Sequence, residues 1–128
     1  MSDKLKYLNC IDQNAELFTD LSDRIWEYAE LSLMEHRSAK LYCDTLSKLG
    51  FEVETPVAGI STAFKASYGS GKPVIGILAE YDALSGLSQQ AGVAQRKEIT
   101  SNGCGHGCGH NMLGAGSLAA ACAVKQYL

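Results

Sequence analysis

The sequence has few prolines, few charged residues and no cluster of basic residues. Two prolines and 20% charged residues in 128 are typical of an ordered globular segment, and they argue against a disordered or fibrous chain. A net charge of −3 without a Lys/Arg-rich stretch argues against nucleic acid or an anionic membrane as the main partner. We therefore expect a small-molecule partner, with no nucleic acid and no membrane.

Long apolar runs are also missing. The opening residues, MSDKLKYLNCIDQNAELF, contain no signal-peptide core, and no stretch approaches the length that spans a bilayer. These two absences predict a cytoplasmic location. Five cysteines are an odd number, which in such a chain argues against a disulfide framework. Cys10, Cys43 and Cys122 lie in helical, partly apolar surroundings typical of small buried residues. Cys104 and Cys108 remain as the thiols with possible chemistry.

The order of patterns along the chain predicts an α/β fold. Apolar residues at spacings of three and four predict helices over residues 14–31 and 35–50, with Gly50 as the C-cap. Short β-branched and aromatic runs then predict neighbouring strands at 51–55 and 62–69. The run PVIGILAEYD, residues 73–82, predicts a central strand buried on both faces, which delivers Glu80 and Asp82 at its C-terminal edge.

The most unusual stretch is SNGCGHGCGHNM, residues 101–112, which leads into a predicted helix rich in small residues. Thiols and imidazoles at every second position are ligands for zinc and related metals, and glycine lets a backbone bend closely around an ion. The loop is too short to wrap a tetrahedral ion by itself, so we expect outside ligands. Glu80 and Asp82 are the candidates, either as direct ligands or as acceptors that orient an imidazole.

Two long stretches together resemble a known family. GILAEYDALSGLSQQAGVAQ and GHGCGHNMLGAGSLAAACAVKQYL are similar to sequences of the aminoacylase and carboxypeptidase-like amidohydrolases, a family of metallopeptidases. DRIWEYAELSLMEHRSAKLYCDTLSKLGFEV resembles the two opening helices and first strand of that family. The resemblance implies a zinc-peptidase-like, three-layer α/β/α catalytic domain, and residues 1–128 would be an N-terminal portion of it.

The resemblance also implies a centre of two Mn or Zn ions that hydrolyses the amide bond of p-aminobenzoyl-glutamate or a related N-acyl amino acid. Cys108 and His110 match metal ligands of the family, and Glu80 is expected as a further ligand. Asp82 matches the catalytic acid that orients the centre.

Three other residues of the loop are not expected to bind metal directly. By the same resemblance, His106 and Asn111 are expected to contact substrate or to support a ligand, rather than to bind metal. Cys104 departs from the family pattern, and we expect it to be a bystander.

By the same resemblance, the general base, further ligands and a dimerisation domain are expected beyond Leu128. We therefore expect residues 1–128 alone to be inactive and the complete enzyme to be a homo- or hetero-oligomer. Two alternatives stay open: a non-catalytic metal-binding module that uses the CGHGCGH loop, and an interaction fragment whose partner completes the sheet.

Overall fold

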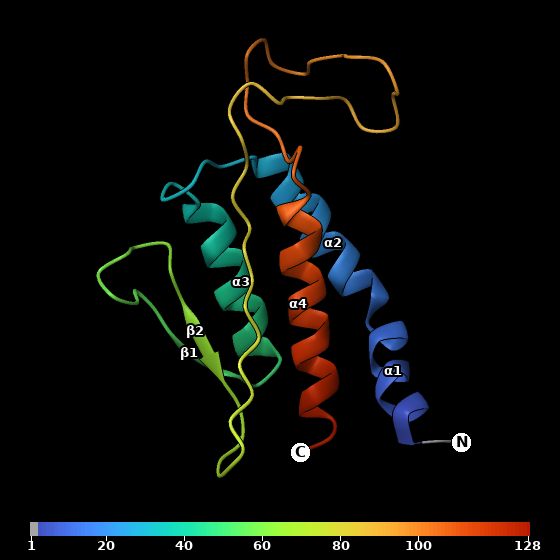
Figure 1. Cartoon of the computed structure of the whole chain (residues 1–128), viewed down its shortest axis with the longest axis vertical. Coiled ribbons are helices and arrows are strands. Elements are labelled where there is room, and N and C mark those ends of the chain that lie inside the picture. Colours follow the sequence, from blue (N-terminus) through green and yellow to red (C-terminus); the bar gives the residue numbers. More distant parts are fainter. Residues whose placement is uncertain (1–2) are drawn as a thin grey trace.

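The computed structural model describes residues 3–128, in which four helices lie beside a two-stranded sheet (Figure 1). This mixed arrangement confirms an α/β-like fold. The elements follow one another as α1 (Asp3–Gln13), α2 (Ala15–Tyr28), α3 (His36–Lys48), β1 (Glu52–Glu54), β2 (Lys65–Ser67) and α4 (His110–Lys125).

The core lies where α4 packs against α1 and α2, and where α2 packs against α3. The helices meet because each carries apolar residues three or four positions apart, which form a stripe along one face. The small residues of α4 let its backbone approach its neighbours closely. The buried cluster consists of Phe18, Leu21, Ile25, Tyr42, Leu46, Ala115, Leu118, Ala119 and Cys122.

The end of α3 confirms the predicted role of Gly50. The glycine has a positive φ of 83°, which residues with a Cβ rarely adopt. The amide of Phe51 then donates to the carbonyl of Leu46 at 3.0 Å, and the amide of Gly50 donates to that of Ser47 at 2.9 Å. This pattern is a Schellman motif, which satisfies carbonyls that the last helical turn leaves unpaired.

The two predicted strands at 51–55 and 62–69 do pair, but over fewer residues than predicted. β1 and β2 are antiparallel, with Val53 opposite Ala66 and Glu54 opposite Lys65. The partly buried Val53 and Ala66 pack against the helical core, while Glu54 and Lys65 form an exposed ion pair.

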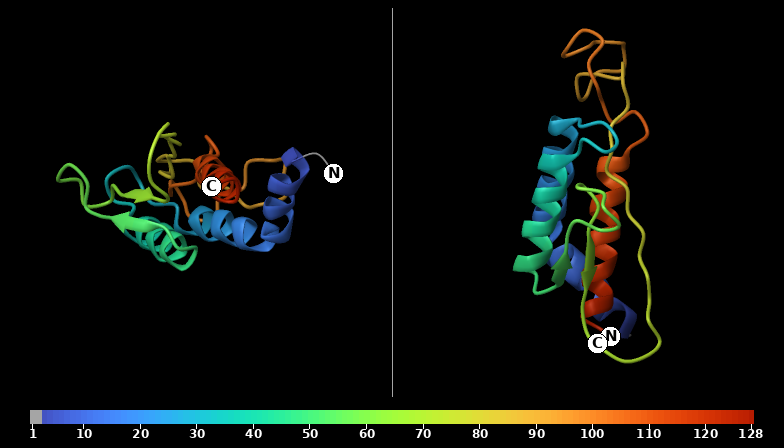
Figure 2. Two further views of the ribbon diagram at one scale, coloured as in Figure 1. Left: turned by 90° about the horizontal axis from the view of Figure 1, so that it is seen from below. Right: turned by 90° about the vertical axis from the view of Figure 1, so that its left-hand side faces the viewer.

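The prediction of a buried central strand at residues 73–82 is wrong for this structure. The segment runs as an extended trace alongside α4 (Figures 1 and 2), without strand pairing within the described residues. Val74 and Leu78 are 83% and 86% exposed. The physical reason is that a strand needs a neighbour that pairs through backbone hydrogen bonds, and here neither β2 nor any other described segment makes such a bond to residues 73–82.

Within residues 3–128, no helix combines the length and the apolar character needed to cross a membrane.

Candidate metal centre

Two carboxylates and one imidazole lie close together where the 73–82 segment ends beside the start of α4. His110 Nδ1 lies 2.7 Å from Asp82 Oδ1, and His110 Nε2 lies 3.2 Å from Glu80 Oε2. The imidazole is 16% exposed and Asp82 is 24% exposed, whereas Glu80 is 54% exposed. The mostly buried ring is therefore held between two carboxylates, of which Glu80 is the more exposed.

Backbone hydrogen bonds tie together the two segments that carry these residues. Leu84 and Gly105 exchange amide-to-carbonyl bonds of 2.9 Å in both directions. The Ala83 amide donates to the carbonyl of Glu30, between α2 and α3, at 2.7 Å. A Cβ on Gly105 would lie 2.0 Å from the backbone oxygen of Leu87, so the close approach requires glycine.

The loop glycines therefore have roles other than wrapping an ion. Gly105 allows contact between two backbones, and Gly109, at the N-cap of α4, adopts a positive φ of 74°. Its amide donates to the carbonyl of His106 at 3.0 Å, which forms the turn that precedes the helix. This turn makes His110 the first residue of α4 and directs it toward the acids.

His106 anchors the loop to α2 instead of joining the three-residue cluster. Its Nε2 lies 3.0 Å from the carbonyl oxygen of Ile25, which can only accept, so Nε2 carries the proton. Burial lowers the pKa of the His106 imidazole and favours the neutral ring. Nδ1 is buried without a hydrogen-bond partner among the described residues. A contact of His106 with substrate remains a prediction.

Asn111 is buried against α2. Its side-chain amide donates to Ser22 Oγ at 3.0 Å and lies 3.4 Å from the Ser22 carbonyl oxygen. The contact fixes the first turn of α4 against α2 and so supports the position of the neighbouring His110. Its predicted role at the substrate is not tested by this contact.

Neither loop cysteine belongs to the cluster of three potential ligands that the described residues form. Cys108 is exposed in the turn before α4, and Cys104 is half-buried; both are free thiols. Of the three cysteines expected to be small buried residues, Cys122 is buried in the core and the half-buried Cys10 packs against it, whereas Cys43 is half-buried outside that cluster. Ligation by Cys108 therefore remains a prediction.

Sequence analysis missed the aromatic and acidic residues that pack beneath the site. Tyr81 stacks against Phe64 and contacts Tyr42, and its hydroxyl donates to the carbonyl of Thr62. Burial, with the nearby Glu35 carboxyl as a further cause, raises the pKa of Tyr81. The sequence did indicate the position of Tyr81. It lies between Glu80 and Asp82, and successive side chains of an extended backbone point to opposite faces, so its ring had to face away from the two acids.

The donor set suits a divalent ion of intermediate hardness. One imidazole nitrogen and two carboxylate oxygens favour zinc or manganese over soft ions such as Cu(I). One potential ligand atom from each of Glu80, Asp82 and His110 lies within 4.8 Å of the others. Two ligands on opposite sides of one ion, with bonds of about 2.0–2.2 Å, lie about 4.0–4.4 Å apart, so atoms within this limit can share an ion. The residues present therefore fit such an ion.

No protein-family model matches the chain, but individual proteins do. It is 48% identical over 120 residues to a subunit of p-aminobenzoyl-glutamate hydrolase from Escherichia coli (strain K12), a match that covers 94% of this chain and 25% of that protein. It is 31% identical over 143 residues to Xaa-Arg dipeptidase of Homo sapiens, covering 98% of this chain and 28% of that protein.

A third relative, thermostable carboxypeptidase 1 of Saccharolobus solfataricus, is 32% identical over 111 residues, covering 85% of this chain and 27% of that protein. The chain thus spans about a quarter of the length of the curated relatives it matches. These similarities confirm the resemblance stated from the EYDAL and GHGCGHN motifs. Along nearly its whole length, the chain is therefore related to the amidohydrolases and peptidases that include p-aminobenzoyl-glutamate hydrolase.

Proposed function

We propose that this chain supplies part of the metal centre of a divalent-metal-dependent amidohydrolase. The observation that carries the proposal is the position of His110, which lies between Asp82 at 2.7 Å and Glu80 at 3.2 Å in a chain similar to hydrolases of amide bonds. The substrate class is p-aminobenzoyl-glutamate or a related N-acyl amino acid. It is supported by the name of the 48% identical relative.

Each side chain of the cluster has a separate task in this proposal. The Nδ1–H of His110 donates a hydrogen bond to Asp82. This bond fixes the ring and leaves Nε2 free to bind an ion. Glu80 lies on the Nε2 side and supplies a carboxylate oxygen to the same ion. Cys108, two residues before His110, supplies a thiolate from the exposed turn that precedes α4.

Bound at these residues, Mn or Zn supplies Lewis-acid activation of an amide carbonyl and of water. The chain's own contribution is to hold the ligands in a fixed arrangement and to leave one face open. Glu80 is the most exposed member of the cluster, so substrate approaches from its side. The base that takes the proton from water lies outside these 128 residues in this proposal, so the chain alone does not turn over substrate.

The wider setting is part of the same proposal. The helices and short sheet would form one portion of a three-layer α/β/α domain with a binuclear centre, in a cytoplasmic enzyme. Assembly with other polypeptides is supported by the name of the E. coli relative, which describes it as one subunit of its hydrolase.

A matched pair of cysteine variants tests whether Cys108 is a ligand. Cys108→Ser is expected to weaken Zn²⁺ binding by at least about 10-fold, because a hydroxyl replaces a thiolate ligand. Cys104→Ser, one Cys-Gly-His triplet earlier, is expected to leave the affinity nearly unchanged. Competition against a chromophoric zinc chelator measures both affinities.

Equal losses in the two variants would contradict the proposal. That result, with unchanged binding in Glu80→Gln and Asp82→Asn, would favour the alternative in which the CGHGCGH loop stores or buffers metal without catalysis. The four variants therefore separate a hydrolase centre from a loop-only site.

A further inference from the structure

Leu87 lies against two of the glycines in the CGHGCGH loop. Its backbone oxygen would be 2.0 Å from a Cβ on Gly105, and its Cδ1 atom would be 2.5 Å from a Cβ on Gly107. Both distances are far below the ordinary contact distance of about 3.5–4.0 Å between non-bonded heavy atoms. Neither position therefore has room for a larger residue while Leu87 stays where it is.

Backbone conformation does not account for these two glycines. Gly109 has a positive φ, which favours glycine, but Gly105 and Gly107 do not. The contact with Leu87 is what excludes a side chain at both positions. Two of the alternating glycines of the loop are thus explained by the shape of one leucine.

Leu87 is itself fixed by hydrogen bonds of its neighbours in the chain. The amide of Ser88 donates to the carbonyl of Gly103 at 3.0 Å, and Ser88 Oγ accepts from the Thr100 amide at 3.0 Å. Three residues before Leu87, Leu84 exchanges two backbone bonds of 2.9 Å with the loop. Although 43% of its surface is exposed, Leu87 therefore offers a fixed surface against which the loop packs.

The side chain of Leu87 contacts the turn that carries Cys108. The turn spans residues 106–109, and the bond from the Gly109 amide to the His106 carbonyl closes it. Gly107 and Cys108 are its two central residues, so the contact at Gly107 lies one residue from the thiol. Among the described residues, no disulfide holds this exposed thiol in place. The contact between Leu87 and Gly107 is thus a restraint on the position of Cys108.

We propose that Leu87 is a positioning residue of the metal centre, which holds the 106–109 turn so that the Cys108 thiolate reaches the ion. The inference rests on the proposed function, because it takes Cys108 as a ligand. Leu87 has no ligand atom in its side chain and acts through its contact with Gly107. Contacts that orient a ligand without touching the metal typically change metal affinity by about 10–100-fold.

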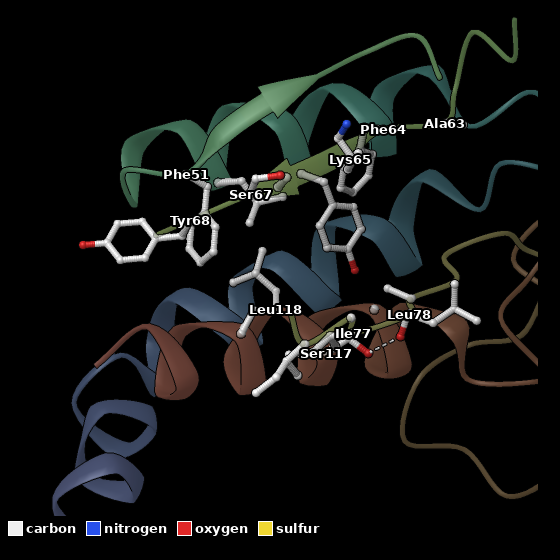
Figure 3. Close-up of a pocket in the computed structure, with 18 of the residues that line it drawn as sticks. Phe51, Ala63, Phe64, Lys65, Ser67, Tyr68, Ile77, Leu78, Ser117 and Leu118 are labelled. Carbon is white, nitrogen blue, oxygen red and sulfur yellow. Dashed lines mark hydrogen bonds between the residues drawn. The ribbon is translucent and has the colours of Figure 1, made fainter. Parts of the chain in front are cut away.

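The acids of the centre are placed by a different contact. Figure 3 shows Ser117 of α4 beside Leu78, where the serine Oγ donates to the leucine carbonyl at 3.0 Å. This bond ties the 73–82 segment to the helix that begins at His110. It does not involve Leu87. A change at Leu87 is therefore expected to disturb the thiolate and to leave the contacts of the imidazole with the acids in place.

Cobalt binding tests the inference, because a bond between Co²⁺ and a thiolate gives a charge-transfer band in the near ultraviolet that nitrogen and oxygen ligands do not give. The unaltered chain saturated with Co²⁺ is expected to show this band, and Cys108→Ser is expected to abolish it. Leu87→Ala is expected to lose most of the band and to bind Zn²⁺ about 10-fold more weakly. Ile99→Ala, which shortens an exposed side chain of the same loop, is expected to retain both.

A second variant tests the same contact from the side of the glycine. Gly107→Ala places a methyl group 2.5 Å from Leu87 Cδ1, so it is also expected to weaken the band and the binding of Zn²⁺. In the Leu87→Ala background that space is empty, and Gly107→Ala is expected to have little further effect.

The order of the turn can also be measured without metal. In the metal-free chain, exchange of the Gly109 amide is expected to be at least about 10-fold faster in Leu87→Ala than in Ile99→Ala. Equal exchange in the two variants would show that Leu87 does not restrain the turn.

Three further results would overturn the inference. An unchanged band and Zn²⁺ affinity in Leu87→Ala would show that Cys108 needs no support from Leu87, and the proposed centre would stand. Equal losses in Ile99→Ala, or additive losses from Leu87→Ala and Gly107→Ala, would show that the contact has no specific role. A band that is absent from the unaltered chain would contradict ligation by Cys108, and with it both the proposed role of that thiol and the inference.

Discussion

Replacing His110 by alanine is expected to weaken binding of Zn²⁺ and Mn²⁺ by at least about 100-fold, the largest effect that we predict for a single side chain of the site. His110 is the one member of the cluster that contacts both carboxylates, at 2.7 Å and 3.2 Å. In the proposed centre, its loss removes a nitrogen ligand and also leaves two carboxylates without the imidazole that contacts both. Isothermal titration of each metal into the purified chain measures the change.

Two further variants make this test specific. His36→Ala removes an exposed imidazole at the start of α3 and is expected to leave both affinities unchanged. Asp82→Asn keeps the size of the side chain but weakens its hydrogen bond to Nδ1, so a smaller loss of about 10-fold is expected. If His110→Ala and His36→Ala bind metal equally well, the cluster is not the binding site.

Gly114→Ala is expected to lower the free energy of unfolding by about 1–3 kcal/mol, although alanine is the better helix former. A Cβ at this position would lie 2.0 Å from the Tyr42 hydroxyl oxygen and 2.9 Å from the Glu80 backbone oxygen. Tyr42 is 1% exposed, so its ring has little room to move. Gly116→Ala is the matched control in the same helix, because nothing lies within 4 Å of its Cβ. It is expected to stabilise the chain by about 0.5–1 kcal/mol.

A double-mutant cycle identifies the clash. Tyr42→Phe removes a buried hydroxyl that has no hydrogen-bond partner among the described residues. In that background, Gly114→Ala is expected to cost less than it does with Tyr42 present. Urea unfolding of the single and double variants measures the coupling. Equal stabilisation by Gly114→Ala and Gly116→Ala would show that α4 does not approach Tyr42 and Glu80 this closely.

The features that sequence reasoning predicted correctly depend on local chemistry. The spacing of Leu21 and Ile25 predicted α2, and Gly50 marked the end of α3 because its positive φ is a local requirement. The approach of Glu80 and Asp82 to the loop was also predicted, since polar residues at the end of a strand-like run often face the start of the next helix.

The features that could not be predicted from the sequence depend on contacts between residues far apart in the chain. The loop glycines were expected to let the backbone bend around an ion, but the role of Gly105 is set by Leu87, whose backbone oxygen leaves no room for a Cβ. Asn111 was expected to contact substrate or to support a ligand, and its contact with Ser22, 89 residues away in the sequence, could not be read from the residues around it. The 73–82 run has the apolar character of a central strand, yet no described segment supplies its neighbour. A residue pattern indicates which element a segment favours, but contacts with distant parts of the chain determine whether that element forms.

The central claim is that His110 and Glu80 bind a divalent ion while Asp82 holds the His110 ring in place. An anomalous-difference map from crystals of the chain grown with Zn²⁺ tests it most directly, because it locates the ion without reference to activity. The account predicts a peak about 2.0–2.2 Å from His110 Nε2 and from a carboxylate oxygen of Glu80. A peak held by Cys104, His106 and Cys108 alone, with the contacts of His110 to both acids unchanged, would contradict it.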